Sequence, residues 1–221
     1  MQKEKQWEGY YSNYFNKASE KGISALEILN SEWYDGKKTA EESVLPYLKA
    51  DDVILEIACG IGRVSKYVAP FCKHLFCSDI IDEALTEAKI NLKDFNNVSF
   101  QKINGYDLRV FDDNYFDLVY SFTTFFHFDF ELVLKYFEEI KRVLKPAGIA
   151  IIEFKRWQDK KDVTELLEKI EAQGGIETYE KELDKWRYIS REILKVICDY
   201  YDFQILDDKV TSYTFRKSDN I

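Results

Sequence analysis

Residues 53–63 read V-I-L-E-I-A-C-G-I-G-R, and this stretch decides the fold. Its short apolar start predicts a buried parallel strand over residues 53–57. Gly60 and Gly62 follow at once, and a helical pattern then runs to about Val68. A glycine turn between strand and helix lets the backbone approach a ligand closely, and the helix N-terminus adds free N–H groups with a partial positive charge. We therefore expect a ligand at this turn.

A single carboxylate, Glu56, stands near the end of this apolar run. The pyrophosphate of a dinucleotide would gain nothing from a nearby carboxylate, whereas a ligand with a cationic amino group would. S-adenosylmethionine (SAM) carries an ammonium and a sulfonium group and no phosphate. The sequence thus favours SAM, with Glu56 accepting a hydrogen bond from the ammonium directly or through water. The alternative is a strand-end carboxylate bonded to backbone.

Composition indicates a globular chain with an acidic balance. The 221 residues suffice for one large α/β domain, and 46% of them are hydrophobic. The formal net charge is −9 and the pI is about 5.0. Proteins that bind a phosphate backbone usually present a basic face, so this balance argues against nucleic acid as the main partner.

Cysteine and histidine usage argues against a metal site. The chain has four cysteines and two histidines, at Cys59, Cys72, Cys77, Cys198, His74 and His127. They contain no C-x-x-C pair, and no zinc or iron–sulfur spacing can be built from them. The start M-Q-K-E-K-Q-W-E-G lacks the apolar core of a leader, and no run is long enough to cross a bilayer. We expect reduced thiols, a cytoplasmic location and no membrane partner.

The chain between residues 53 and 154 alternates between strand and helix patterns. Strands are predicted at 53–57, 74–78, 98–103, 116–121 and 149–154, with helices at 62–68, 83–92 and 131–144. Asp82 is the expected cap of the second helix. This βαβ alternation predicts a parallel sheet with helices on both faces, which binds ligands at the carboxyl ends of its strands.

The two ends of the chain differ from this middle part. Residues 1–50 form an N-terminal helical segment, with a predicted helix at 39–48, and the charged residues 159–188 form an inserted segment. Ser190 caps a predicted helix that ends at Tyr200. Strands at 203–206 and 211–215 are joined by so short a turn that they must be antiparallel. We expect an α/β, Rossmann-like, doubly wound sheet of seven strands that is mostly parallel, in a single domain over residues 1–221.

Five segments in this order resemble motifs of the class I SAM-dependent methyltransferases, and the resemblance covers about residues 40 to 155. They are L-E-I-A-C-G-I-G-R at 55–63, the acid that closes L-F-C-S-D-I at Asp79, N-G-Y-D-L at 104–108, F-D-L-V-Y-S at 116–121 and R-V-L-K-P-A-G at 142–148. Ala58 and Ala147 stand where the family usually has glycine. Alanine still fits position 58 if its φ is negative.

The resemblance implies that SAM is the cofactor and S-adenosylhomocysteine (SAH) the product. Asp79 is expected to accept hydrogen bonds from both ribose hydroxyls, or else to cap the next helix. The residues after the third strand are expected to face adenine, with either Asn104 or Asp107 on its amine. The full set expected to hold the cofactor is Glu56, Ala58, Cys59, Gly60, Gly62, Arg63, Asp79, Ile80, Asn104, Gly105, Tyr106, Asp107 and Ser121.

The implied reaction is methyl transfer to the oxygen or nitrogen of a small-molecule acceptor by in-line attack on the sulfonium methyl. His127 is a candidate general base, and a structural histidine is an equal alternative. The aromatic residues Trp33, Tyr34, Trp157 and Trp186 are candidates for the acceptor pocket. Tyr10, Tyr11 and Tyr14 share a helix that we expect to pack on the sheet, rather than to form the lid that similar proteins use.

Two other function classes remain open from the sequence. An NAD-dependent oxidoreductase would share the strand, turn and helix, but Ser65 stands where its fingerprint needs a third small residue, and Glu56 and the antiparallel end also disfavour it. A non-catalytic binding subunit with this fold would keep the same motifs. Intact Glu56 and Asp79 argue for retained cofactor binding.

Overall fold

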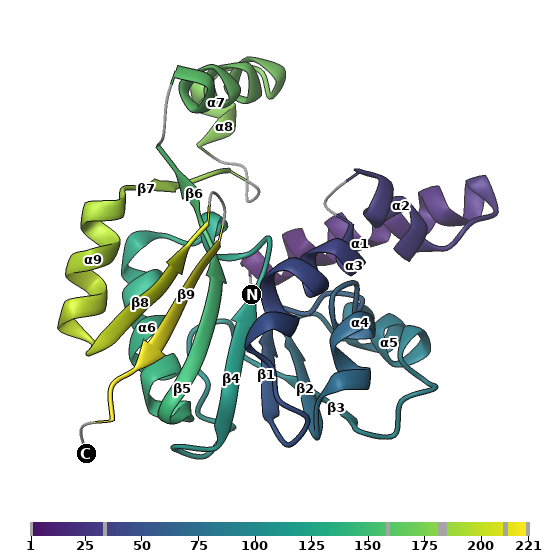
Figure 1. Ribbon diagram of the computed structural model, residues 1–221. Coiled ribbons are helices and arrows are strands. Elements are labelled where there is room, and N and C mark those ends of the chain that lie inside the picture. Colours follow the sequence, from purple (N-terminus) through teal and green to yellow (C-terminus); the bar gives the residue numbers. More distant parts are fainter. Residues whose placement is uncertain (1, 33–34, 158–159, 181–184, 210–211, 220–221) are drawn as a thin grey trace.

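A computed structural model describes residues 2–32, 35–157, 160–180, 185–209 and 212–219. Its centre is a seven-stranded sheet of order β3-β2-β1-β4-β5-β9-β8 (Figure 1). The strands are β1 (Val53–Ile57), β2 (His74–Asp79), β3 (Val98–Lys102), β4 (Phe116–Ser121), β5 (Leu144–Glu153), β8 (Phe203–Asp208) and β9 (Ser212–Lys217). The first five are parallel, and β9 runs antiparallel to both β5 and β8. The predicted fold class is confirmed.

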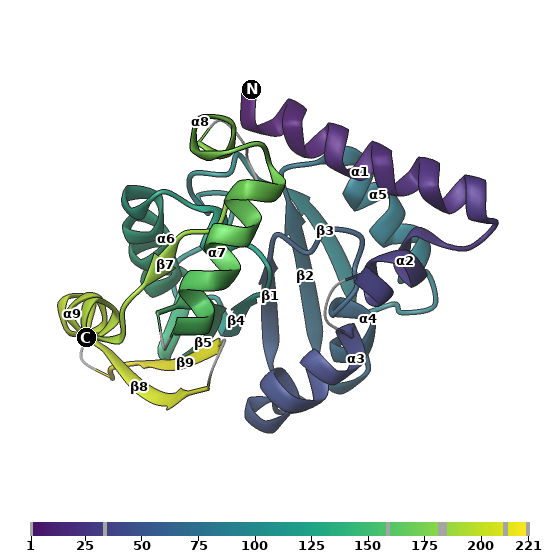
Figure 2. The ribbon, with the colours of Figure 1, turned by 90° about the horizontal axis from the view of Figure 1, so that it is seen from above.

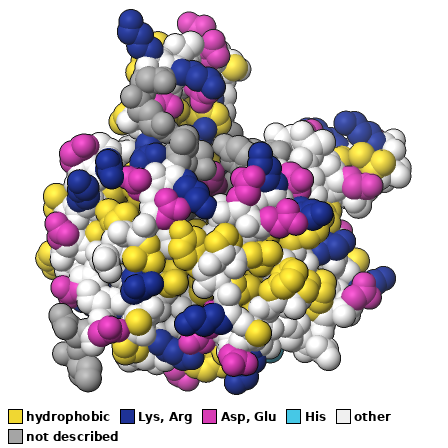
Figure 3. Space-filling model, in the orientation of Figure 1, with side chains coloured by type: hydrophobic (Ala, Val, Ile, Leu, Met, Phe, Trp, Pro, Cys, Tyr) yellow, Lys and Arg dark blue, Asp and Glu magenta, His cyan; other side chains and the backbone are white. Residues whose placement is uncertain are grey.

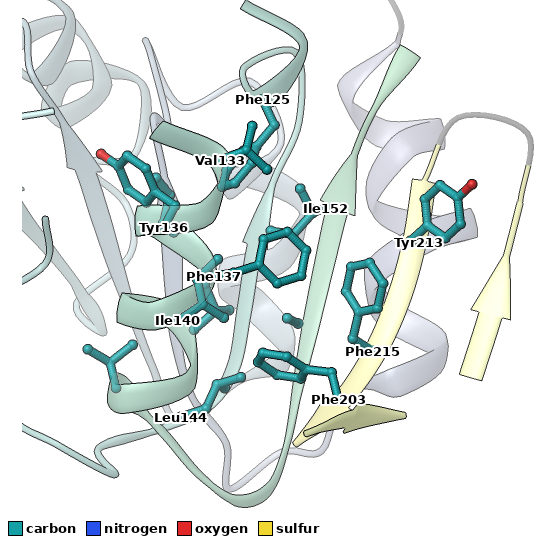
Figure 4. Close-up of a cluster of buried hydrophobic side chains, with 14 of the residues drawn as sticks. Phe125, Val133, Tyr136, Phe137, Ile140, Leu144, Ile152, Phe203, Tyr213 and Phe215 are labelled. Atoms are coloured by element: carbon teal, nitrogen blue, oxygen red, sulfur yellow. The ribbon is translucent and has the colours of Figure 1, made fainter. Parts of the chain in front are cut away.

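Helices cover both faces of the sheet (Figure 1). One face carries α6 (Phe130–Val143) and α9 (Arg191–Tyr200). The other carries α4 (Ser65–Val68), α5 (Asp82–Asn91) and a segment that winds through α3 (Gly36–Thr39), η1 (Ala40–Val44) and η2 (Leu45–Tyr47), with η3 (Ala69–Phe71) after α4. In the core under α6, Phe137 points toward Phe203 and Phe215 of the hairpin (Figure 4). This packing ties the antiparallel end to the parallel part.

The N-terminal helices lie at the ligand edge of the sheet. Helix α1 (Gln2–Lys21) packs with α2 (Ala25–Glu32) around Tyr14 and Ile28, and their cluster includes Ile61 of the glycine turn and Ile81 before α5. Seen from above, α1 lies beside α5 at the carboxyl ends of the strands (Figure 2). The expectation that this helix packs on the sheet is therefore wrong.

The inserted segment projects above the same edge (Figure 1). It contains α7 (Lys160–Ala172) and α8 (Ile176–Tyr179), and it is anchored by a small parallel sheet of β6 (Lys155–Arg156) and β7 (Tyr188–Ile189). A short η4 turn (Phe125–His127) joins β4 to α6. Within the described residues, no helix has both the length and the apolar character needed to cross a bilayer.

Several local expectations need correction. The helix predicted from Gly62 begins only at Ser65, because Gly62 has a φ of +82° and continues the turn. Asp82 does not cap α5: it is the first helical residue, and its carboxylate pairs with Lys102 at 2.5 Å instead. The helix predicted for 39–48 is divided into short α, π and 3-10 pieces. Ser190 caps α9 as predicted, accepting from the Ile193 amide at 3.3 Å.

The two alanines at glycine positions also differ from expectation. Ala58 has a φ of +57° and Ala147 a φ of +59°. Both therefore hold the left-handed conformation that favours glycine, and the condition of a negative φ, under which alanine would fit position 58, is not met. Each alanine therefore carries local backbone strain.

Candidate active site

The strand register places Glu56 among polar partners in the middle of the sheet. Glu56 on β1 lies beside Cys77 on β2 and Tyr120 on β4. Tyr120 donates its hydroxyl to Glu56 Oε2 at 2.8 Å, and the Ser65 hydroxyl donates to the same oxygen. The Glu56 side chain is buried, with 3% exposure, and burial raises its pKa to about 7 against the effect of these hydrogen bonds.

Asp79, at the end of β2, is the second buried carboxylate. Its Oδ2 accepts from the Gly60 amide at 2.8 Å and its Oδ1 from the Ile81 amide at 3.0 Å. Burial raises the pKa of Asp79, and these amide bonds oppose the rise. Each carboxylate oxygen has two lone pairs, so both can accept a further hydrogen bond. Asp79 thus fixes the glycine turn against β2 and can still bind a ligand.

Two adjoining cavities open along the carboxyl ends of β1, β2, β3 and β4. The larger has a volume of about 310 Å³, and its wall includes Asp79, Ile80 and the loop after β3. The smaller, of about 80 Å³, lies against the glycine turn and includes Glu56 and Arg63. Five residues line both cavities: Trp7, Tyr11, Ala58, Thr123 and His127. We call these five residues the junction.

Most of the residues predicted for cofactor binding come together on these walls. Those that line one or both cavities are Glu56, Ala58, Cys59, Gly60, Arg63, Asp79, Ile80, Asn104, Gly105 and Tyr106. The other three residues, Gly62, Asp107 and Ser121, line neither cavity. Asp107 instead pairs with Arg109 at 2.7 Å, which lowers the pKa of the carboxyl to about 2. Ser121 donates to the Ile57 carbonyl at 2.8 Å.

The loop after β3 leaves Asn104, rather than Asp107, at the cavity. Asn104 Oδ1 accepts from the Tyr106 amide at 2.8 Å and from the Asp107 amide at 3.0 Å, which fixes the loop. Gly105 has a φ of +79°, and a Cβ at this position would lie 3.1 Å from Ile80. A glycine here keeps the wall of the larger cavity flat.

His127 lies at the junction with little exposure. Its ring meets that of Trp7 edge to face at a centroid distance of 5.3 Å, and its Nδ1 is 3.4 Å from the Lys185 carbonyl oxygen. Of the four aromatic residues suggested for an acceptor pocket, Trp157 stacks on Tyr188 and Trp186 lies between Lys155 and Lys169. Neither belongs to the described walls, and residues 33 and 34 lie outside the described residues.

Helix α1 closes the site from above. The Tyr11 hydroxyl packs directly on the glycine turn, since a Cβ on Gly60 would lie 2.6 Å from it. At the other end of the site, Lys102 bridges α1 to the start of α5 through Glu4 at 3.1 Å and Asp82 at 2.5 Å. The sequence pattern favours a helix packed on the sheet rather than a lid over the cofactor. The observed position of α1 fits the lid better.

A third buried carboxylate was not predicted. Glu153 ends β5 with 4% exposure, and its Oε2 accepts from the Thr123 amide at 2.5 Å. Thr123 has a φ of +53°, so this bond holds a strained residue of the junction in place. Burial raises the pKa of Glu153, and the nearby charge of Arg63 lowers it. An acid that closes an apolar strand is the same sequence signal that identified Glu56.

The walls fit SAM better than they fit a nucleotide with phosphates. Glu56 and Asp79 each line one cavity, and buried Glu153 is bonded to the junction residue Thr123; Arg63 and Lys102 are the cations on the same walls. This excess of negative charge suits a ligand with sulfonium and ammonium groups and disfavours a pyrophosphate. The described residues hold no cluster of three or more His, Cys, Asp or Glu side chains that could bind a metal ion.

Comparison with known proteins agrees with this geometry. Residues 55–152 match the family model described as a methyltransferase domain. A phosphoethanolamine N-methyltransferase of Plasmodium falciparum is 25% identical over 156 residues, which are 66% of this chain and 58% of that protein. An uncharacterized RNA methyltransferase of Oceanobacillus iheyensis is 33% identical over 67 residues, 28% of this chain and 15% of that protein. The chain therefore matches less than two thirds of the length of each relative.

Solved structures share the fold at low identity. A protein of Pyrococcus horikoshii OT3 superposes with a TM-score of 0.63 and 22% identity, over 82% of this chain and 89% of that one. A chain from the Haloferax volcanii complex between the Trm112 methyltransferase activator and a methyltransferase gives a TM-score of 0.64 and 18% identity, over 88% and 93% of the two chains. At these identities the likeness concerns the fold.

Proposed function

We propose that the chain is a class I SAM-dependent methyltransferase, and that it transfers the SAM methyl group to an oxygen or nitrogen of a small-molecule acceptor. The observation that carries this proposal is the pair of buried carboxylates, Glu56 and Asp79, in adjoining cavities along one sheet edge. When bound, SAM supplies a methyl group that is already activated for transfer. The protein then has to position two partners and exclude water.

Each end of the site has residues suited to one part of the cofactor. Asp79 would accept from the ribose hydroxyls, and the loop 104–106 would face adenine across the larger cavity. Glu56 would accept from the ammonium in the smaller cavity. The junction between them is where an acceptor can meet the methyl group, since Trp7, Thr123 and His127 line both cavities there. His127 is the candidate base for an acceptor hydroxyl.

The relatives support a small acceptor more than they support RNA. The Plasmodium falciparum relative is named for a small phosphorylated amine and matches 66% of this chain, whereas the RNA methyltransferase matches 28%. The chain carries a net charge of −9, and on the face shown in Figure 3 basic side chains are interspersed with acidic ones. A continuous basic surface, as nucleic-acid binding needs, is not visible on that face.

Methyl transfer from isotope-labelled SAM tests the proposal. The purified chain would be incubated with pooled small amines, alcohols and phenols in one arm, and with total RNA in the other. We expect a methyl-labelled product only in the small-molecule arm, and its loss in Asp79→Asn. If the label appeared in RNA instead, the acceptor would be RNA and the small-molecule proposal would be wrong. SAM binding without transfer to any pool would favour the non-catalytic alternative.

A further inference from the structure

We infer that the acceptor is an aliphatic amine, recognised as a cation at the junction. This inference rests on the proposed function and names the substrate class of the same site. It follows from two independent features of the walls, which are the balance of buried charge and the arrangement of aromatic rings. The charge balance would not help an uncharged alcohol or phenol.

The walls of the two cavities carry the acidic residues Glu4, Glu56 and Asp79 and the basic residues Arg63 and Lys102, and Glu153 is bonded to the junction residue Thr123. Glu56, Asp79 and Glu153 are each at most 4% exposed, whereas no lysine or arginine among the described residues is buried to that extent. Arg63 is half-buried, and Lys102 at the outer rim is matched by Glu4 and Asp82. Arg63 offsets part of the charge of Glu56 and Glu153, so a cation that enters this site gains from the negative charge that remains, and a further anion is repelled.

Aromatic rings provide the second feature. The rings of Trp7 and Tyr10 meet at 74° with centroids 5.2 Å apart, and those of Tyr10 and Tyr11 at 88° and 5.6 Å. The ring of His127 meets that of Trp7 at 71°. All four rings line the smaller cavity, and aromatic rings on a cavity wall bind ammonium groups through cation–π attraction. Tyr10 is held by a bond to Tyr14, which donates to Glu32 at 2.8 Å.

The reaction itself favours an amine in this environment. An ammonium acceptor first gives one proton to a base such as His127 or to water. The nitrogen lone pair then forms the new N–C bond while sulfur keeps the electrons of the broken S–C bond, so the positive charge passes from sulfur to nitrogen. The total charge of the site is unchanged in that step. The carboxylates raise the pKa of an ammonium and of an alcohol alike, but the ammonium starts from a much lower pKa, so a base in the site can remove its proton more readily.

A pair of matched probes tests the inference without turnover. Choline and 3,3-dimethylbutan-1-ol have the same shape and differ in one charged atom. We would measure the binding of each to the SAH-saturated protein by calorimetry, and we expect choline to bind at least about tenfold more tightly, as desolvated cation–π contacts allow. Trp7→Leu should remove most of this preference, whereas Trp7→Phe, which keeps a ring, should retain it.

Trp157→Leu is the matched control, because Trp157 is an exposed tryptophan that lines neither cavity. It should leave the preference unchanged. Glu153→Gln keeps an oxygen for the Thr123 amide but removes a charge, and should reduce the preference without loss of SAH binding. Equal affinity for the two probes, with SAH bound normally, would overturn the amine inference alone. Failure to bind SAM or SAH would overturn the proposed function and the inference with it.

Discussion

At the scale of single residues, the site depends on carboxylates that the sheet holds out of water. Glu56 is the clearest case, because Tyr120 and Ser65 both donate to one of its oxygens and burial still raises its pKa to about 7. A cationic ligand would remove this disadvantage by pairing with the ionised form. Ionised Glu56 therefore lowers the stability of the ligand-free protein and favours the binding of a cationic ligand.

Glu56→Gln should separate these two effects. Between the unfolded pKa near 4.5 and the folded pKa of about 7, the folded protein retains a proton that the unfolded chain loses, so the stability contribution of Glu56 falls as pH rises. Glutamine does not titrate. The free energy of unfolding of the variant, relative to that of the wild type, should therefore rise by up to about 3 kcal/mol between pH ~4 and pH ~8, at about 1.4 kcal/mol per pKa unit. Denaturant unfolding at the two pH values measures this gain, and calorimetry should show weakened SAM binding.

The control for this variant is Glu138→Gln, an exposed carboxylate on α6 that pairs with Lys135. It should change neither SAM binding nor the pH dependence noticeably. If the free energy of unfolding of Glu56→Gln, relative to that of the wild type, fell as pH rose, the pKa of Glu56 would be lowered in the folded protein. That result would contradict the effect expected from its burial.

Ala58 carries strain that glycine would relieve. An alanine with a φ of +57° costs about 1–2 kcal/mol relative to the right-handed region, and glycine loses about half of that advantage to its greater freedom when unfolded. Ala58→Gly should therefore stabilise the protein by about 1 kcal/mol, or about 2–4 °C in Tm for a chain of this size. Ala147→Gly, far from the cavities in sequence, should do the same, whereas Ala150→Gly in β5 should destabilise. Equal losses in all three would contradict the strained turns.

At the scale of elements, α1 determines whether the site is open. It supplies Trp7 and Tyr11 to both cavities, and Lys102 ties its start to α5 through an exposed ion pair, which solvent screens. The buried cluster around Tyr14 holds the middle of α1, so we expect the start of the helix to move when a ligand enters and to become more ordered once the ligand is bound.

Hydrogen exchange can follow this ordering. We expect saturation with SAH to slow the exchange of α1 amides near Trp7 and Tyr11 more strongly than that of α9 amides, which belong to an element that does not line the cavities. Equal protection of α1 and α9 would mean that the ligand stabilises the whole fold and that α1 is not a separate cover.

The strands and their end residues could be predicted because the signals are local. Apolar runs gave β1, β2 and β4, and carboxylates after such runs gave Glu56 and Asp79. Asp107 was a poorer candidate than its position suggested, because Arg109 two residues later pairs with it. The role of α1 could not be predicted, since Trp7 meets His127 across 120 positions of the sequence, and no local pattern records that contact.

At the scale of the whole molecule, we propose that residues 1–221 act as one domain. The hairpin β8–β9 packs through Phe203 and Phe215 on the same core as α6, and α1 packs on the turn after β1. Thermal unfolding should therefore show one transition. SAH at a hundredfold excess over its Kd should raise the free energy of unfolding by about 2.7 kcal/mol, and the midpoint temperature should rise accordingly. A separate transition for the segment that holds α7 and α8 would divide the chain into two units.

The most direct test of the central claim is the calorimetric binding of SAM and SAH to the wild type, Asp79→Asn and Asp107→Asn. The amide introduced by Asp79→Asn would keep one oxygen for the Gly60 or Ile81 amide, and Asp107 is an acid outside the described walls. We expect micromolar binding to the wild type and to Asp107→Asn, and strongly weakened binding to Asp79→Asn. Absence of binding to a folded wild type, or equal binding to all three, would contradict a SAM site at this edge of the sheet.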